Sequence, residues 1–170
     1  MGSRRSSRRG EDEPEIRELE LTEEIFQELA ELTRNIYFFE GIPVEELSEL
    51  CRGIGLFEFP EGTCILRQGS PGDSFFLVYT GRAKVRVNRG FLRRTLEVAT
   101  LVRGHVFGEM ALVLDEPRSA DVVADGPVQS FVFRRKVFET VLKDNALFAE
   151  QVRELVRKRT QENDFVKAYT

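Results

Sequence analysis

The sequence predicts a mainly β domain with helices at both ends, a β-roll of the double-stranded β-helix or jelly-roll type. Short stretches of β-prone residues, separated by turns that contain glycine, fill residues 55–133. Apolar residues at helical spacing lie on both sides of that region. The 170 residues give room for one domain with short flanks and not for two full domains.

The N-terminal part is predicted to hold a disordered tail over residues 1–15 and helices over 16–54. The tail has almost nothing apolar to bury. A first helix is expected after Thr22, a suitable N-cap, with an apolar face made of Ile25, Leu29, Leu32 and Ile36. A second helix is expected from Pro43, with an apolar face made of Val44, Leu47 and Cys51.

The β-roll at 55–133 is built from short strands. They are expected at 57–59, 64–66, 75–79, 83–87, 96–101, 122–124 and 128–133. The segment 134–170 returns to helical spacing and predicts a short helix around 137–142 and a longer one after Asn145. The apolar stripe of the longer helix is formed by Phe148, Val152, Leu155 and Val156.

Composition and charge exclude several classes of protein. The net charge is −4, and residues 11–50 are so acidic that DNA binding is not expected. No charge-free stretch is long enough for a transmembrane helix. A single histidine, His105, argues against metal sites built from several histidines, and two cysteines are too few to hold a fold together by disulfides.

The segment 107–120 carries the chemistry. Gly108 permits a tight turn, and residues 109–114 can form a short helix whose free N–H groups favour an anion. Arg118 offers a forked cation that suits phosphate oxygens, and Ser119 adds a hydroxyl. A carboxylate beside an anion site makes sense when the ligand also presents hydroxyls. Glu109 together with Arg118 therefore predicts a sugar phosphate as the ligand.

This segment resembles the phosphate-binding cassette of the cyclic nucleotide-binding domains of cAMP-dependent kinase regulatory subunits, cyclic nucleotide-gated channels and catabolite activators. The family pattern F-G-E-x-A-L, a short spacer and P-R-x-A is matched by Phe107-Gly108-Glu109, Ala111-Leu112 and Pro117-Arg118-Ser119-Ala120. The upstream glycines are also similar, in Pro60-Glu61-Gly62, Gln68-Gly69, Pro71-Gly72-Asp73 and Gly81. The resemblance covers about residues 36–160.

The resemblance implies a role for each residue of the cassette. Glu109 is expected to accept from the ribose 2′-OH and Arg118 to pair with the cyclic phosphate. Backbone N–H groups of Gly108, Glu109 and Ala120 are expected to support the ligand. The expected contacts also include Phe107, Met110, Ala111 and Val98. A hydroxyl at Ser119 can bond the phosphate or a syn guanine amino group, which leaves cGMP open while cAMP is favoured.

The resemblance also makes the last helix a lid over the base, with Val156 packing on the ring and Arg153 stacking on it. The alternative for Arg153 is a solvated pair with Glu150. For the pair of Glu109 and Arg118, the alternative is an ordinary surface ion pair.

The predicted function is a non-enzymatic cyclic nucleotide sensor that rearranges its terminal helices for an effector protein or an attached effector domain. The alternatives are an interaction module with an empty pocket and, less favoured, a cupin-like enzyme. No cofactor besides the ligand is expected. A homo-oligomer and a cytoplasmic location, or the cytosolic face of a membrane, agree with this function. Met1-Gly2 with Ser6 fits an N-myristoylation pattern, although a disordered tail or a non-native start is the favoured interpretation.

Overall fold

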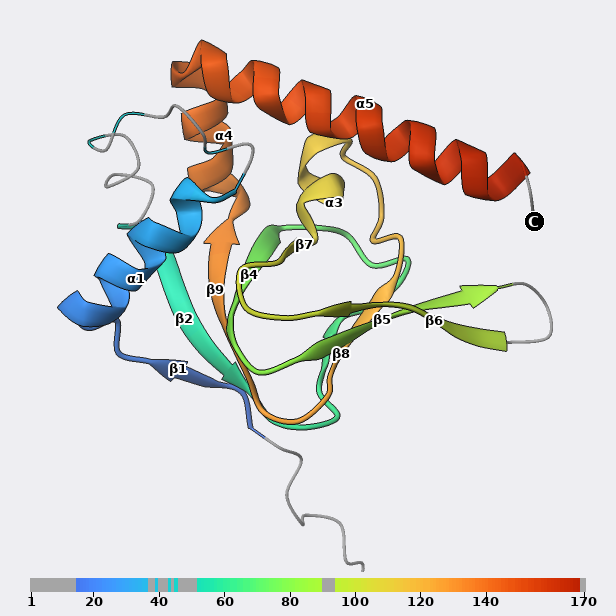
Figure 1. Cartoon of the computed structure of the whole chain (residues 1–170), viewed down its shortest axis with the longest axis horizontal. Coiled ribbons are helices and arrows are strands. Elements are labelled where there is room, and N and C mark those ends of the chain that lie inside the picture. The colour runs from blue at the N-terminus through green and yellow to red at the C-terminus, as the bar shows by residue number, and fades with distance from the viewer. Residues whose placement is uncertain are drawn as a thin grey trace, which may run out of the picture.

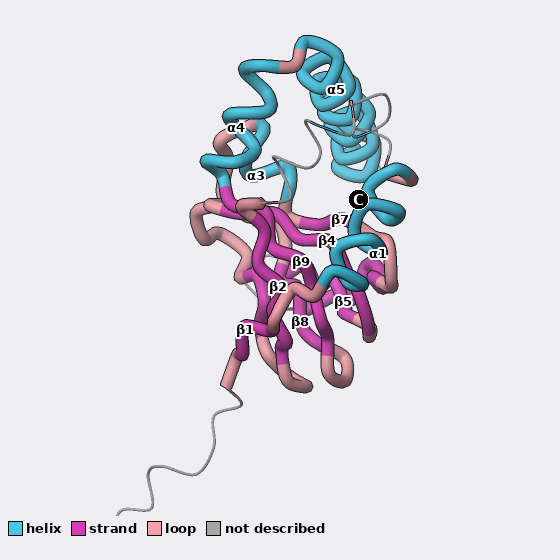
Figure 2. The backbone as a smooth tube through the Cα atoms, turned by 90° about the vertical axis from the view of Figure 1, so that its left-hand side faces the viewer, coloured by secondary structure: helices cyan, strands magenta, loops and turns pink. Residues whose placement is uncertain are grey.

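The computed structural model describes residues 15–36, 39, 43, 45, 52–89 and 94–168. The side chain of Arg89, and those from residue 159 onward except Gln161, fall outside the description. Strands fill one end of the molecule, and α4 (Arg135–Asp144) and α5 (Ala146–Ala168) lie across the other (Figures 1 and 2). The predicted mainly β fold with flanking helices is confirmed.

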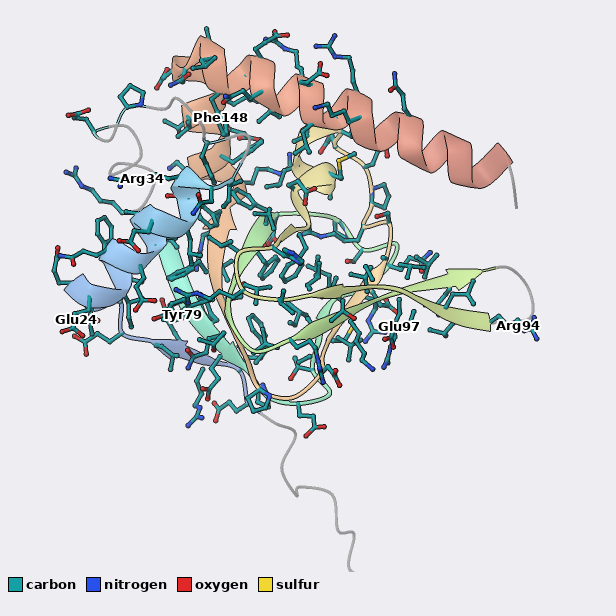
Figure 3. All side chains as sticks on the ribbon, viewed as in Figure 1. Glu24, Arg34, Tyr79, Arg94, Glu97 and Phe148 are labelled. Atoms are coloured by element: carbon teal, nitrogen blue, oxygen red, sulfur yellow. The ribbon has the colours of Figure 1, made fainter. Side chains whose placement is uncertain are left out.

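The described strands form two antiparallel sheets. The five-stranded sheet has the order β1 (Arg17–Leu19), β2 (Ile54–Phe59), β9 (Val128–Arg134), β4 (Ser74–Thr80) and β7 (Val106–Phe107). The four-stranded sheet has the order β3 (Cys64–Leu66), β8 (Asp121–Ala124), β5 (Ala83–Arg89) and β6 (Arg94–Leu101). The hairpin of β5 and β6 projects away from the rest of the strands, and Arg94 and Glu97 lie on its outer part (Figures 1 and 3).

Two short strands depart from the sequence prediction. β1 lies inside residues 16–54, for which the sequence predicts helices, so that prediction is wrong for these three residues. β1 pairs antiparallel with β2, and Arg17 forms an ion pair with Glu58. β7 has only two residues and pairs with β4. Neither strand is long enough to show the alternation of apolar and polar residues by which strands are recognised. Both form because a neighbouring strand offers them free backbone groups.

Two helices, α1 and α3, form where the sequence predicts them. α1 (Glu23–Arg34) begins after Thr22, whose Oγ1 accepts a hydrogen bond from the Ile25 amide at 3.4 Å. α3 (Glu109–Val113) occupies the short helix expected after Gly108. Among the residues of the second predicted helix, Val44, Leu47 and Cys51 lie outside the described residues.

The core joins the β-roll to the helices above it. Phe75 on β4 stacks on Phe133 on β9, with ring centroids 4.3 Å apart. Phe39 reaches from the N-terminal segment and stacks on Phe148 of α5, with centroids 5.7 Å apart. Phe148 is fully buried where α5 begins, at the end of the molecule that holds α4 (Figure 3). The first turn of α5 is therefore part of the core.

Replacing Phe148 by alanine should lower the free energy of unfolding by about 3–5 kcal/mol, because the substitution removes a fully buried aromatic ring. The matched control is Leu147→Ala, since the neighbouring Leu147 is 49% exposed and should change stability by less than about 0.5 kcal/mol. Urea denaturation of the two variants measures both values. Equal losses would contradict the packing of α5 described here.

Candidate functional site

Arg118 lies at the centre of the candidate site, and only 5% of the residue is exposed. Its Nη1 donates to the carbonyl oxygen of Gly108 at 2.5 Å, and its Nη2 donates to that of Ser74 at 2.6 Å. The Nε–H of Arg118 is buried and has no hydrogen-bond partner among the described residues. The guanidinium is thus held in place by two backbone oxygens, and its Nε–H is left without a partner among the described residues.

The backbone of Arg118 is fixed as firmly as its side chain. Its amide donates to the carbonyl of Ser70, and its own carbonyl accepts from the amide of Gly69, both at 2.8 Å. These two bonds join the loop after β3 to the segment that follows α3. The side chain of Arg118 can therefore reach inward from a well-determined starting point.

Two glycines make room for the guanidinium. A Cβ at Gly108 would lie 2.8 Å from Nη1 of Arg118 and 3.0 Å from Cδ1 of Leu66, and the φ angle of +82° is one that glycine adopts without strain. A Cβ at Gly72 would overlap the Cβ of Ala111 and lie 3.2 Å from Cζ of Arg118. Both glycines belong to the motifs noted in the sequence, and their role here is close approach.

Glu109 begins α3 and is 1% exposed, and its negative charge acts on Arg118, which is also buried. The two side chains therefore do not form an exposed surface ion pair. Burial lowers the pKa of Arg118, and the negative charges of Asp73 and Glu109 act in the opposite direction. A guanidinium stays protonated at physiological pH. The site is therefore a buried cation with two carboxylates in its electrostatic surroundings.

The rest of the cassette is gathered around this pair. Phe107 is buried and its ring centroid lies 4.9 Å from that of Phe76, on which it stacks. Ala111 is a buried residue of α3. Met110 and Ala120 are half-buried, whereas Ser119 is exposed beside Arg118 in the chain. The residues of the cassette thus form a local cluster in which Ser119 is exposed to solvent.

Three of the predicted ligand contacts, Val98, Arg153 and Val156, lie outside the cassette. Val98 lies on the edge strand β6 and is 54% exposed. Arg153 pairs with Glu150 at 2.7 Å, which is the alternative considered from the sequence. Val156 is half-buried on α5, and this helix runs over α3 (Figure 1). Stacking of Arg153 and packing of Val98 on a base stay predictions.

Two elements of the site could not be found from the sequence. The acceptor at Ser74 is a backbone oxygen, and backbone groups leave no signature in the residue type. Arg135, which contacts the loop at Gly72, stands in the sequence as one of two adjacent arginines, with nothing to distinguish it from Arg134. Both come to the site through tertiary contacts.

Neither a metal centre nor a membrane span is found where the structure is described. The described side chains include no group of three or more His, Cys, Asp or Glu residues placed to hold a metal ion. None of the described helices is long and apolar enough to cross a membrane.

Comparison with known proteins identifies the family. A model of the family described as "Cyclic nucleotide-binding domain" matches residues 56–145, just over half of the chain. A cGMP-dependent protein kinase from Eimeria tenella is 29% identical over 123 residues, which cover 72% of this chain and 12% of the kinase. This chain therefore corresponds to a small part of that relative.

Solved structures show the same fold. The regulatory domain of Toxoplasma gondii PKA, crystallised with cAMP, has a TM-score of 0.68 and 27% identity, over 80% of this chain and 49% of that one. A cyclic nucleotide-binding domain from Methylobacillus flagellatus has a TM-score of 0.72 and 26% identity, over 91% of this chain and 89% of that one.

The close packing at Gly108 predicts a specific loss of stability. Gly108→Ala should destabilise the protein more than Gly62→Ala, although both positions have a positive φ. Each variant bears the strain of left-handed backbone, about 1–2 kcal/mol. Only the Cβ at position 108 also meets Arg118 and Leu66, since nothing lies within 4 Å of a Cβ at position 62. Urea denaturation compares the two, and equal losses would contradict the steric role of Gly108.

Proposed function

Because the chain belongs to the cyclic nucleotide-binding domain family, we propose that Arg118 and Glu109 form the nucleotide site and that cAMP is its ligand. The matched residues, 56–145, include both side chains. The observation that carries the assignment is the burial of Arg118, which is 5% exposed and whose Nε–H lacks a partner among the described residues. A buried cation with an unused donor is suited to an anion.

A cyclic phosphate would complete the surroundings of this cation. Its single negative charge compensates a buried guanidinium better than two neutral carbonyl oxygens can. Its oxygens can also accept from the donors of Arg118 in a fork. Glu109, buried at the start of α3, would accept from the ribose 2′-OH. Arg118 and Glu109 would therefore bind the phosphate and the sugar of the same ligand.

Support for a cyclic nucleotide as the class of ligand is stronger than support for cAMP over cGMP. A related structure holds cAMP, whereas a related kinase is named for cGMP. Ser119 is exposed next to Arg118, so its hydroxyl is free to bond the phosphate or a syn guanine. We propose cAMP as the main ligand and cGMP as a second one.

The proposed activity is sensing and not catalysis. A cupin-like enzyme needs several metal ligands that converge on one cavity, and the sequence has a single histidine, His105, which makes that alternative the less favoured one. One relative is named as a kinase and another as a kinase regulatory domain, which favours an effector for this chain, either attached or separate. We also propose a cytoplasmic location, because cyclic nucleotides act as second messengers inside the cell. An interaction module with an empty pocket stays the second candidate. Binding of a cyclic nucleotide in a titration would exclude it, and failure to bind would favour it.

Arg118→Ala should weaken cAMP binding at least tenfold, because a charge-assisted contact contributes about 1.5–3 kcal/mol. Glu109→Gln should cost less, since an amide oxygen still accepts from a hydroxyl. Isothermal titration with cAMP, cGMP and AMP measures the affinities. The control is Arg82→Ala, which removes an exposed arginine paired with Asp125.

Arg118 also donates to two backbone carbonyls, so its replacement by alanine can disturb folding. Arg118→Lys therefore serves as a second variant. It keeps the charge and loses the fork, so its binding should fall between wild type and alanine. Wild-type affinity in a folded Arg118→Ala or Arg118→Lys variant would refute the assignment of the site. Failure of the wild-type protein to bind any of the nucleotides would refute the function.

Arg153→Ala should weaken cAMP binding about twofold to fivefold if this side chain leaves Glu150 to stack on the base, because an exposed cation–π contact contributes about 0.5–1 kcal/mol. Arg157→Ala is the matched control, since Arg157 lies on the same helix and also pairs with Glu150. Titration with cAMP distinguishes the two. The same small effect from both variants would mean that Arg153 acts only as a surface charge.

A further inference from the structure

A ring of hydrogen bonds ties the β5–β6 hairpin to the end of the cassette. Asp121, the first residue of β8, accepts from the backbone amide of Gln68 at 2.7 Å through Oδ1. Its Oδ2 accepts from Nδ2 of Asn88 on β5 at 2.9 Å. The side chain of Gln68 closes the ring, because its Oε1 accepts from the backbone amide of Asn88 at 2.7 Å. One carboxylate therefore joins the loop after β3, strand β5 and the residue that follows the cassette.

The ring also determines which way the side-chain amide of Asn88 points. An ionised carboxylate can only accept hydrogen bonds, so Asn88 turns its Nδ2 toward Asp121. Its Oδ1 then faces the hydroxyl of Thr95, which donates to it at 2.7 Å. Thr95 lies opposite Asn88 on β6. The hydrogen bonds that begin at Asp121 thus reach both strands of the hairpin.

The ring lies where the hairpin leaves the sheet. The pairing of β5 with β8 ends at Arg86, which lies opposite Asp121, and Asn88 is two residues farther along β5. From there the hairpin projects away from the other strands (Figure 1). A two-stranded hairpin is only marginally stable by itself in water. The side chains of Asp121 and Gln68 therefore hold the hairpin at a point where strand pairing with β8 has already ended.

The hairpin exposes apolar side chains next to this ring. Leu96 is 44% exposed, and Val98 is 54% exposed. The register of the hairpin shifts between Val85 and Arg86, so that Val98 has no opposite residue on β5. A purine base has flat apolar faces that such side chains can cover. They can do so only if the hairpin is held at a fixed place relative to Arg118.

We propose that Asp121 is a positioning residue that holds the β5–β6 hairpin in place for the base of the nucleotide. The proposal rests on the proposed function, in which Arg118 binds the phosphate. Asp121 follows Arg118 by three positions, on a backbone that is bonded to the loop 69–70, so its place relative to the phosphate site is fixed. Its bond to Asn88 in turn fixes the hairpin. Loss of that bond should weaken contacts with the base and leave contacts with the phosphate.

The test measures the contribution of the base to binding as a ratio of two dissociation constants. One is that of the cyclic phosphate of ribose, which lacks the base, and the other is that of cAMP. Asn88→Asp keeps the size of the side chain but sets a second carboxylate against that of Asp121, so repulsion replaces their bond. Isothermal titration should show the ratio falling about threefold to tenfold, as expected for one lost hydrogen bond. The affinity for the cyclic phosphate of ribose should change by less than about twofold.

A second substitution should reverse this loss. When Asn88→Asp is combined with Asp121→Asn, the new amide can donate to the new carboxylate and still accept from the amide of Gln68. The double variant should therefore regain the wild-type ratio. The matched control is Asp125→Asn, which removes a carboxylate that pairs with Arg82 just after the other end of β8 and should leave the ratio unchanged.

The outcomes separate this inference from the proposed function. A wild-type protein that binds neither cAMP nor cGMP refutes the proposed function and this inference with it. If the wild type binds cAMP, a wild-type ratio in Asn88→Asp refutes the inference alone. An equal loss of affinity for both probes also refutes it, because the ring would then only support the fold. A loss that the double variant does not reverse does the same, since it would not arise from the bond between residues 88 and 121. If Asn88→Asp does not fold, Asn88→Ala removes the bond without adding a charge, and the same ratio decides.

Discussion

The burial of the Arg118 charge is the constraint from which the arrangement of the site follows. Removing a guanidinium from water costs several kcal/mol unless hydrogen bonds and opposite charges replace the lost hydration. Here the carbonyl oxygens of Gly108 and Ser74 supply the hydrogen bonds, and Asp73 and Glu109 supply negative charge nearby. The Nε–H of Arg118 still has no hydrogen-bond partner among the described residues, so an anion would complete the hydrogen bonding of this cation.

The same constraint explains why segments far apart in the sequence meet at this point. A carbonyl can reach a buried guanidinium only where its backbone comes very close, and Gly72 and Gly108 permit that approach. The two backbone bonds between Arg118 and the loop 69–70 then fix the distance between the β-roll and the cassette. The guanidinium therefore cannot move unless at least one of these loops moves. A ligand that shifts the guanidinium would in this way also displace backbone that it does not contact.

The sequence predicted most of this site because the cassette is contiguous, and a contiguous motif needs no tertiary information. It predicted most strands because alternation and glycine turns are local signals. It did not predict β1, whose residues Arg17–Leu19 become a strand only through pairing with β2. It also could not identify Arg135 or the carbonyl of Ser74, since both act through contacts that depend on the folded backbone. A motif match also does not specify where side chains outside the motif lie, and the contacts of Val98 and Arg153 with a base stay predictions.

The packing of the C-terminal helices limits how a ligand can move them. Phe138 of α4 and both Phe148 and Val152 of α5 are buried in the core, so neither helix can swing freely. The joint between them is also fixed, because Asn145 accepts from the amide of Phe148 at 2.8 Å and its own amide donates to Val141. A displacement of α4 would therefore move the first turns of α5 with it. Closely packed cores shift between discrete arrangements more readily than they deform, so we expect a small concerted shift near the core and a larger response in the part of α5 beyond Val152.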